Sequence, residues 1–229
     1  MEDVIEDFQE RVTELNEYLT LLVYLSHNDA KISIMGKRDK AVETLALKTM
    51  KASCFLMLYN LVESCIRGAM TKLYEQMNSE EKHLQEFDSH VKEIWIEQCF
   101  RKMEPCSANQ SSYRQLIKGM VDKVLDSSSV ELDPRKLHLS GNLDAREIRK
   151  LFEKHKISTQ THYRAFNGAE LRTIKDQRNS LAHGNISFSD CGQQYTVSDI
   201  IAIKNQAVVF LRSSLRNIKK HIENTQYAA

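Results

Sequence analysis

The segment from Arg178 to Gly184, Arg-Asn-Ser-Leu-Ala-His-Gly, contains the residues of this chain best suited to chemistry on phosphate. The planar guanidinium of Arg178 can donate two parallel hydrogen bonds to a phosphate group. His183 can carry a proton near neutral pH, and a position at the end of a helix favours its protonated form. The pattern therefore predicts a site for phosphoryl chemistry. An arginine in an ion pair beside a helix-capping histidine would leave the same pattern.

Arg178 also occupies an unusual place in its expected helix. Leu171, Ile174 and Leu181 recur at spacings of three and four, and position 178 completes this apolar stripe. A guanidinium on the buried side of a helix needs a carboxylate, a phosphate or the mouth of a cleft. His183 lies about 140° further round an ideal helix. The two side chains can therefore share a site only if the helix ends at Gly184 or a second chain completes the site.

The run from Ile174 to Gly184 resembles the R-N-x-x-x-H signature of the HEPN superfamily, which comprises all-α ribonucleases of toxin–antitoxin pairs, phage defence and CRISPR effectors. Arg178, Asn179 and His183 match the signature. The resemblance implies a metal-independent endoribonuclease in which the ribose 2′-hydroxyl attacks its own phosphodiester, leaving 2′,3′-cyclic phosphate and 5′-hydroxyl ends. Arg178 would then hold the phosphate, Asn179 would position the backbone or a partner motif, and His183 would transfer protons.

The same resemblance implies partners for the chain. His183 is the only proton carrier in the motif, so an acid and a base together require two motifs, and HEPN proteins supply them by forming dimers. We therefore expect a homodimer that acts on RNA without a metal or cofactor, with an antitoxin or another defence-system protein as a partner. Related toxins continue to a tyrosine two residues past the histidine, where this chain has Asn185, which puts regulation by modification of that tyrosine in doubt.

A polar stripe on the expected long helix could support the motif. Asn60, Glu63 and Arg67 lie at spacings of three and four, so they share one face. Two interpretations remain open. Glu63 can form an ion pair with Arg67 on its own helix, which offsets the cost of burying either charge. Alternatively Glu63, or Asn60, orients Arg178 or His183, and the HEPN resemblance favours Glu63 because these proteins often place a polar residue of an earlier helix against the motif.

A second R-N-x-x-x-H pattern runs from Arg216 to His221, close to the end of the chain. No glycine follows it and lysines surround it, so we interpret it as surface chemistry or an RNA-contacting patch rather than a second active site. Basic residues gather in this region and between 135 and 164. The candidate RNA contacts are Arg149, Lys150, Arg212, Arg216, Lys219 and Lys220.

The composition indicates a mostly helical, cytoplasmic protein. Only 7 Gly and 2 Pro interrupt 229 residues, and 41% of the chain is hydrophobic, which suits one domain with a single core. Its first residues are acidic, unlike a signal peptide, and its longest apolar run, Cys54 to Tyr59, is too short to cross a bilayer. Five cysteines without a Cys-x-x-Cys pair favour reduced core residues over a metal site.

Hydrophobic periodicity predicts an all-α, HEPN-like antiparallel helical bundle that forms one domain over 1–229. We expect an N-terminal helix within 1–30, a core formed by 39–104 and 168–224, and a helical insertion or cap over 105–167.

Within these regions, a helix over Asp39 to Met77 should be the centre of the core. A third helix should run from Ser79 until Pro105 ends it. Alternating apolar residues at 186–188 and 195–197 predict a small β-hairpin before a final helix that begins at Ser198.

Two functions other than RNA cleavage also fit the sequence. The chain could be a HEPN-like protein without nuclease activity that serves as an interaction or nucleotide-binding module. It could instead be a dimeric helical scaffold joined through the apolar seam of residues 5–22.

Overall fold

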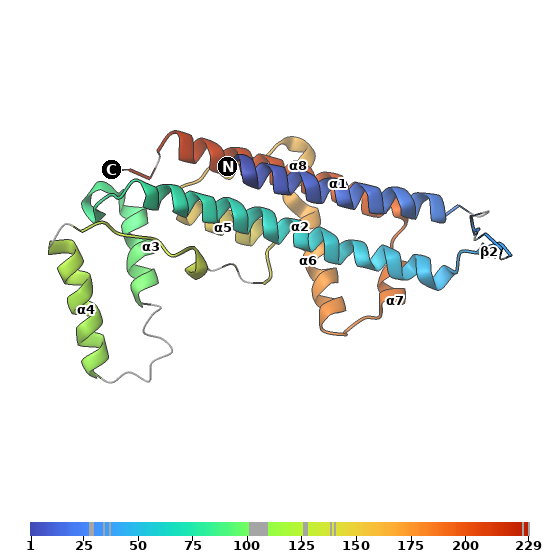
Figure 1. Ribbon diagram of the computed structural model, residues 1–229, viewed down its shortest axis with the longest axis horizontal. Helices are drawn as coiled ribbons and strands as arrows, with labels where there is room; N and C mark the ends of the chain where they lie inside the picture. The colour runs from blue at the N-terminus through green and yellow to red at the C-terminus, as the bar shows by residue number, and fades with distance from the viewer. Residues whose placement is uncertain are drawn as a thin grey trace.

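A computed structural model describes residues 1–27, 30–33, 35–36, 38–100, 110–125, 128–137, 139, 141–225 and 227–228. Most of these residues are helical (Figure 1). The elements in chain order are α1 (Glu2–Leu25), β1 (Lys31–Ile32), β2 (Lys40–Ala41), α2 (Thr44–Ser79), η1 (Leu84–Glu86), α3 (Ser89–Phe100), α4 (Gln110–Leu125), η2 (Pro134–Lys136), α5 (Ala145–Lys154), η3 (Tyr163–Gly168), α6 (Ala169–Ala182), α7 (Phe188–Gln193) and α8 (Val197–Glu223). The predicted all-α class is confirmed.

Three long helices form the body of the molecule. Helix α1 runs opposite to α2 and α8 and packs on both of them (Figure 1). Its apolar seam repeats at spacings of three and four, which places one continuous stripe against the other two helices. The buried residues of this stripe are Phe8, Val12, Leu15, Leu19 and Leu22. The antiparallel bundle expected from the sequence therefore rests on α1, α2 and α8.

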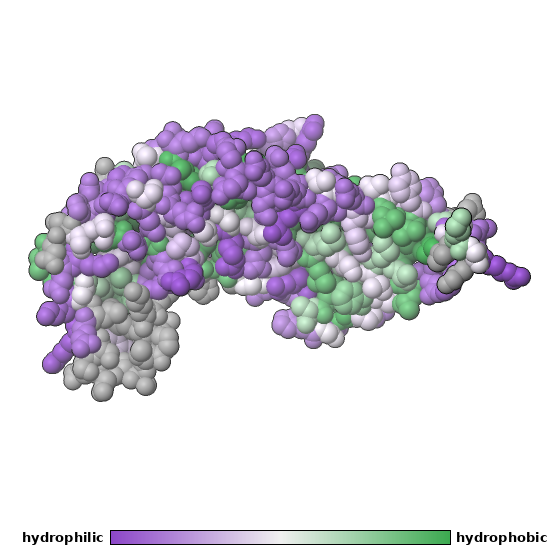
Figure 2. All heavy atoms as spheres, viewed as in Figure 1, coloured by the Kyte–Doolittle hydropathy of each residue, from purple (hydrophilic) through white to green (hydrophobic). Residues whose placement is uncertain are grey.

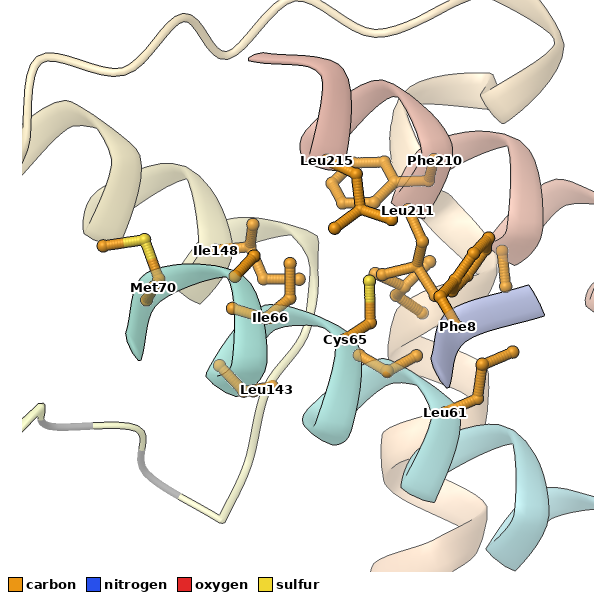
Figure 3. Close-up of a cluster of buried hydrophobic side chains, with 14 of the residues drawn as sticks. Phe8, Leu61, Cys65, Ile66, Met70, Leu143, Ile148, Phe210, Leu211 and Leu215 are labelled. Carbon is orange, nitrogen blue, oxygen red and sulfur yellow. The ribbon is translucent and has the colours of Figure 1, made fainter. Parts of the chain in front are cut away.

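Helix α2 lies at the centre of the core, as its apolar middle predicts. Phe55, Leu58, Leu61 and Ile66 on this helix are almost inaccessible to solvent. Figure 3 shows α2 side chains meeting Phe8 of α1, residues of α8, and Leu143 and Ile148 from the chain around α5. Burial of the Leu143 side chain therefore fixes the segment that leads into α5 to the core.

By length and composition, α2 is the one helix among the described residues that could cross a membrane. The longest uninterrupted apolar run, Cys54 to Tyr59, did not indicate this, because the apolar character of α2 extends over a longer stretch that polar residues interrupt. The helix also packs against α1, α6, α7 and α8, as the central helix of a soluble bundle does.

The structure corrects several expected elements. The prediction of a β-hairpin at 186–188 and 195–197 is wrong, because helix α7 (Phe188–Gln193) occupies most of the residues between the expected strands. Ser187 starts α7 by accepting a hydrogen bond from the Asp190 amide, which favours a helical turn over a strand. The long helix begins at Thr44 rather than Asp39, after the short β1–β2 pair. The predicted stop at Pro105, like Cys106, lies outside the described residues.

A buried polar pair joins α2 to α5. The His155 ring lies 2.8 Å from the Tyr74 hydroxyl through Nε2 and 2.7 Å from the Leu151 carbonyl through Nδ1. A carbonyl only accepts, so Nδ1 carries the proton and the Tyr74 hydroxyl donates to Nε2. Burial lowers the pKa of His155 to about 4. The imidazole is therefore neutral in the folded protein at neutral pH.

This pair predicts a loss of stability in acid. Above about pH 6.5 the imidazole is neutral whether the chain is folded or unfolded. As the pH falls towards 4, the imidazole of His155 takes up a proton in the unfolded chain but stays largely neutral in the folded protein. This difference removes on the order of 3 kcal/mol from the free energy of unfolding. Urea unfolding between pH 7 and 4 should show a weaker acid dependence in His155→Gln than in the parent. Exposed His27→Gln is the control, and equal slopes for His155→Gln and the parent would contradict the assignment.

Candidate active site

Helix α6 carries the motif and ends in a glycine-dependent turn. Gly184 has φ +69°, a left-handed conformation that glycine adopts after a helix at little cost. Its amide donates to the Leu181 carbonyl at 3.2 Å, and the Asn185 amide donates to the Ser180 carbonyl at 2.9 Å. These two bonds satisfy carbonyls that the helix end would leave unpaired. They also fix the backbone on both sides of His183, the C-cap residue.

Arg178 lies on the side of α6 that faces α2, as the interrupted apolar stripe predicts. Its guanidinium carbon is 4.1 Å from the centre of the Tyr59 ring, a cation–π contact with α2. Nη1 donates to the Gly141 carbonyl at 3.1 Å and to Asn179 Oδ1 at 2.8 Å. Within the described part of the chain, Nε and Nη2 make no hydrogen bond. The sequence left open a carboxylate, a phosphate or the mouth of a cleft as the partner of this cation; an aromatic face and a carbonyl hold it instead, and two donors stay available.

The residues around Arg178 converge on one segment, Gly141 to Leu143. The amide of Asn179 donates from Nδ2 to Asn142 Oδ1 at 2.6 Å. The Tyr59 hydroxyl accepts a hydrogen bond from the Leu143 amide at 3.1 Å, and Leu143 itself is buried in the core. The motif and this segment therefore brace one another, and α2 supplies the ring between them.

A partly buried ion pair fixes α5 to α6 one turn before Arg178. Lys175 Nζ lies 2.7 Å from Asp144 Oδ2, and both side chains are mostly covered. Asp144 also caps α5, because Oδ1 accepts hydrogen bonds from the amides of Arg146 and Glu147. Burial opposes ionisation of Asp144, but Lys175 and these amides hold the pKa of this carboxyl below its ordinary value. One carboxylate thus starts α5 and positions the helix that carries the motif.

His183 is exposed, and its ring makes no hydrogen bond or ion pair within the described residues. Helical geometry directs it away from Arg178, which turns inward to α2. A single chain therefore offers a fixed guanidinium and a solvent-facing imidazole as separate features. The sequence left two ways for the groups to share a site, a helix end at Gly184 or a second chain. The helix does end there, and completion of the site by a second chain stays a prediction.

The structure separates the polar stripe of α2 from the motif. Glu63 accepts a hydrogen bond from Arg67 Nη2 at 2.8 Å, which is the local ion pair left open by the sequence. Asn60 Oδ1 accepts from Arg11 Nη1 of α1, also at 2.8 Å. The expectation that Glu63 or Asn60 hydrogen-bonds to Arg178 or His183 is therefore wrong for the described contacts. Glu63 instead bonds Arg67 one turn away on α2, and Asn60 bonds Arg11 on the adjacent α1.

The second R-N-x-x-x-H pattern is not a surface patch as a whole. His221 is 1% exposed and its ring packs near Tyr227, whereas Arg216 is exposed. Asn217 Nδ2 donates to the carbonyls of Ser158 and Gln160, both at 2.8 Å. The expected surface role is therefore wrong for His221, because α8 turns it into the core while Arg216 faces solvent.

The candidate RNA contacts are in different environments. Arg212, Arg216 and Lys220 on α8 are exposed, while Lys219 is 2.7 Å from Glu2 of α1. The two candidates on α5 are engaged elsewhere. Lys150 pairs with Glu147 at 2.7 Å. Arg149 is half-buried and donates from Nη2 to the Asn167 carbonyl at 2.5 Å. Of these candidates, only Arg212, Arg216 and Lys220 of α8 combine an exposed side chain with the absence of an ion pair within the described structure.

Sequence reasoning missed the groups that hold Arg178 in place. Tyr59 was assigned only to the core, and Asn142 had no assigned role. Asp144 carried a usable signal, since Asp-x-x-Glu at 144–147 is a helix-start pattern, but its ion pair with Lys175 depends on how α5 packs on α6. No group of three or more His, Cys, Asp or Glu residues in the described regions is placed to hold a metal ion.

The Tyr59 contact predicts a local loss of stability. Tyr59→Phe keeps the ring beside Arg178 but leaves the buried Leu143 amide without its acceptor, which should cost about 1–3 kcal/mol of unfolding free energy. Urea unfolding measures this loss, and amide hydrogen exchange should show weaker protection at Leu143. Tyr18→Phe is a matched control, because its hydroxyl donates to the Met50 carbonyl away from the motif. Unchanged Leu143 protection in Tyr59→Phe would contradict the assignment.

Comparison with known proteins adds one match. The family model described as MAE_28990-like HEPN matches residues 1–227, almost the whole chain. Searches of curated proteins and of solved structures produced no significant match.

Proposed function

The chain belongs to the MAE_28990-like HEPN family, and from this premise we propose that it is a metal-independent endoribonuclease with Arg178 and His183 in its active site. HEPN domains are often ribonucleases, so the family supports a role in RNA cleavage or a related process. The proposal includes cytoplasmic action as a toxin or antiviral effector, with an antitoxin or defence-system partner, by analogy with the superfamily.

The arrangement of Arg178 is the observation that carries the proposal. Tyr59 and Gly141 hold the guanidinium, while Nε and Nη2 remain unbonded among the described residues. A guanidinium offering two adjacent donors matches two oxygens of one phosphate. Because other contacts already fix its position, little reorganisation is needed when negative charge develops on the phosphate during the reaction. Asn179 supports this position by bonding both Arg178 and Asn142.

His183 supplies the proton transfer in this mechanism. The ribose 2′-oxygen forms a bond to phosphorus while the bond from phosphorus to the 5′-oxygen breaks. A base removes the proton from the 2′-hydroxyl, and an acid protonates the departing 5′-oxygen. One imidazole can perform one of these transfers at a time, so we assign the acid and the base to His183 of two copies of the chain. The products carry 2′,3′-cyclic phosphate and 5′-hydroxyl ends.

The surface near the motif supports a homodimer. Figure 2 shows hydrophobic residues gathered over the first half of α2 and the adjoining region of α6 and α7. Leu45 is 61% exposed and Phe188, which begins α7 shortly after His183, is 36% exposed. Contiguous apolar surface on a soluble protein commonly marks an interface. A dimer formed through this face would bring the two motifs close together.

The direct test is cleavage of single-stranded RNA by the purified chain in EDTA. The proposal expects products with 2′,3′-cyclic phosphate ends, and no cleavage of DNA of the same sequence, which lacks the attacking hydroxyl. Intact RNA after incubation with the chain, alone and with its cellular partners, would refute the nuclease. Cleavage that leaves a 3′-hydroxyl would refute this mechanism.

The composite site predicts that an inactive chain inhibits an active one. Wild-type chains mixed with a tenfold excess of His183→Ala chains should cleave RNA about tenfold more slowly than the same amount of wild type alone, because most wild-type chains then form mixed dimers that keep only one imidazole. Sedimentation should show that the His183→Ala chain still forms dimers. A rate equal to that of the wild type alone would argue that each chain acts with its own motif alone.

A non-catalytic module is the second candidate, and a specific contact favours it. Arg178 and Asn179 both bond the segment at Gly141 and Asn142, so they could serve only to brace that segment. In that case Arg178→Ala would lower stability and His183→Ala would have no consequence at all. The effect of His183→Ala on cleavage separates the two functions.

A further inference from the structure

A basic groove lies at the opposite end of α6 from His183. It is formed between α1, α8 and η3, with a volume of about 510 Å³, and its lining includes Arg164, Phe166, Lys204 and Arg212. Helix α6 spans 14 residues, which places the two ends about 20 Å apart. This groove is therefore separate from the candidate active site.

The backbone of η3 holds an aromatic ring out to solvent in this groove. Phe166 and Asn167 both adopt left-handed conformations, with φ of 44° and 54°, and Phe166 is 64% exposed. Left-handed backbone is costly for a bulky residue and persists only where surrounding contacts enforce it. Arg149 enforces it here by bonding the Asn167 carbonyl, and Gly168 packs so closely on Phe210 and Ala145 that no side chain would fit.

The charges of the groove lack carboxylate partners. Lys204 and Arg212 make no ion pair within the described structure, and burial together with the nearby charge of Arg212 lowers the pKa of Lys204. Lys204 donates instead to the neutral Asn16 of α1 at 2.7 Å. Glu6, Glu10, Glu14 and Glu17 of α1 line a different groove. Two cations that line one groove without a counter-charge favour an anionic ligand.

We propose that this groove binds single-stranded RNA, with Phe166 stacking on a base and Lys204 and Arg212 contacting the flanking phosphates. Proteins that bind single-stranded nucleic acid without sequence preference usually combine an exposed aromatic ring with cations that contact the nucleic-acid phosphates. Arg216 continues the same ridge of α8 one turn further, so the positive surface extends beyond a single phosphate. The choice of RNA over another polyanion rests on the proposed function.

Binding of fluorescent oligouridine to the full-length His183→Ala chain tests the proposal, because that chain should leave the RNA intact. Phe166→Asn removes the ring while asparagine tolerates the left-handed backbone. Phe166→Asn should weaken RNA binding roughly ten- to a hundredfold. Phe166→Tyr keeps an aromatic ring and should bind RNA as the parent does. Arg212→Gln should weaken binding and lower the slope of log affinity against log salt by about 1. Arg114→Gln, on exposed Arg114 of α4, removes the same charge elsewhere and should leave binding unchanged.

Unchanged affinity in Phe166→Asn, or an equal loss in Arg114→Gln and Arg212→Gln, would overturn the proposal. Altered sedimentation of RNA-free Phe166→Asn with unchanged RNA affinity would also overturn it, in favour of a protein partner in the groove. The nuclease and the groove can fail separately. A wild-type chain that binds RNA through Phe166 but never cleaves it supports the groove and refutes the nuclease. A wild-type chain that cleaves RNA, while its groove variants bind RNA normally, supports the nuclease and refutes the groove.

Discussion

His183→Ala should slow RNA cleavage by at least roughly 10²- to 10⁴-fold, because the change removes both the acid and the base of the dimer and one such group usually contributes that much. The same change should leave the free energy of unfolding within about 0.5 kcal/mol of the parent, as for other exposed positions. The ring is exposed and unbonded within the described structure, and backbone bonds from Gly184 and Asn185 hold the helix end without it. Loss of activity without loss of stability is the signature expected of a proton carrier.

Arg178→Ala should behave differently from His183→Ala. It should lose roughly 10²- to 10³-fold in cleavage rate, as for other donors that stabilise developing charge, and it should also lower stability. The loss of stability follows because Arg178 braces Tyr59 and Gly141. Arg178→Lys should stay impaired, since a lysine cannot reproduce the forked donor pair.

Single-turnover cleavage rates and urea unfolding of the same preparations measure both quantities. Arg114→Ala is the matched control, because it removes an exposed arginine of α4 outside both the motif and the proposed RNA groove. Its cleavage rate should remain close to that of the parent. Wild-type rates in His183→Ala would refute the assignment of the site.

Gly192→Ala should lower the free energy of unfolding by roughly 3 kcal/mol, at the upper end of the cost of overpacking. A Cβ at this position would lie 1.8 Å from the Lys48 carbonyl oxygen and 2.7 Å from its carbon. These are backbone atoms of α2, so they cannot move aside as the tip of a side chain could. Helix α7 would have to lift from α2, breaking the bond from Lys48 Nζ to Gln193 and that from Lys51 Nζ to the Tyr195 carbonyl.

Urea unfolding at neutral pH measures the effect of Gly192→Ala. Gly119→Ala, on α4 with no atom within 4 Å of the added carbon, is the control and should raise stability by up to about 1 kcal/mol. Gly184→Ala has equally open surroundings but a left-handed backbone, so it should cost about 1 kcal/mol. If Gly192→Ala were as stable as the parent, α7 would not pack on α2 as closely as described.

Local patterns predicted the helices whose burial follows from their own periodicity. The apolar seam of α1 and the apolar middle of α2 required burial, and both are buried. Helix α6 also ends before Gly184, one of the two possibilities that the sequence left open, because a left-handed residue after a helix strongly favours glycine. The position of Arg178 towards α2 also followed from periodicity, since one polar residue interrupted an otherwise apolar stripe.

Other features depend on residues far apart in the sequence. Alternating apolar residues around Phe188 and Tyr195 predicted strands, but the close approach of Gly192 to Lys48 and the cap at Ser187 favour a short helix there. Glu63 had two chemically sensible partners, and the helical neighbour Arg67 took it. In the same way, periodicity could not reveal that α8 turns His221 inward, where it packs near Tyr227.

The sequence by itself determined the residue types of the motif, the helices that carry it and the glycine that ends α6, because helix periodicity and the left-handed turn are local properties of the chain. Only the tertiary structure decided what holds the motif in place. Tyr59 and the 141–143 segment meet Arg178 because α2 and α6 pack together, and Asp144 reaches Lys175 because α5 packs on α6. Packing between distant segments chooses among partners that local chemistry makes equally acceptable.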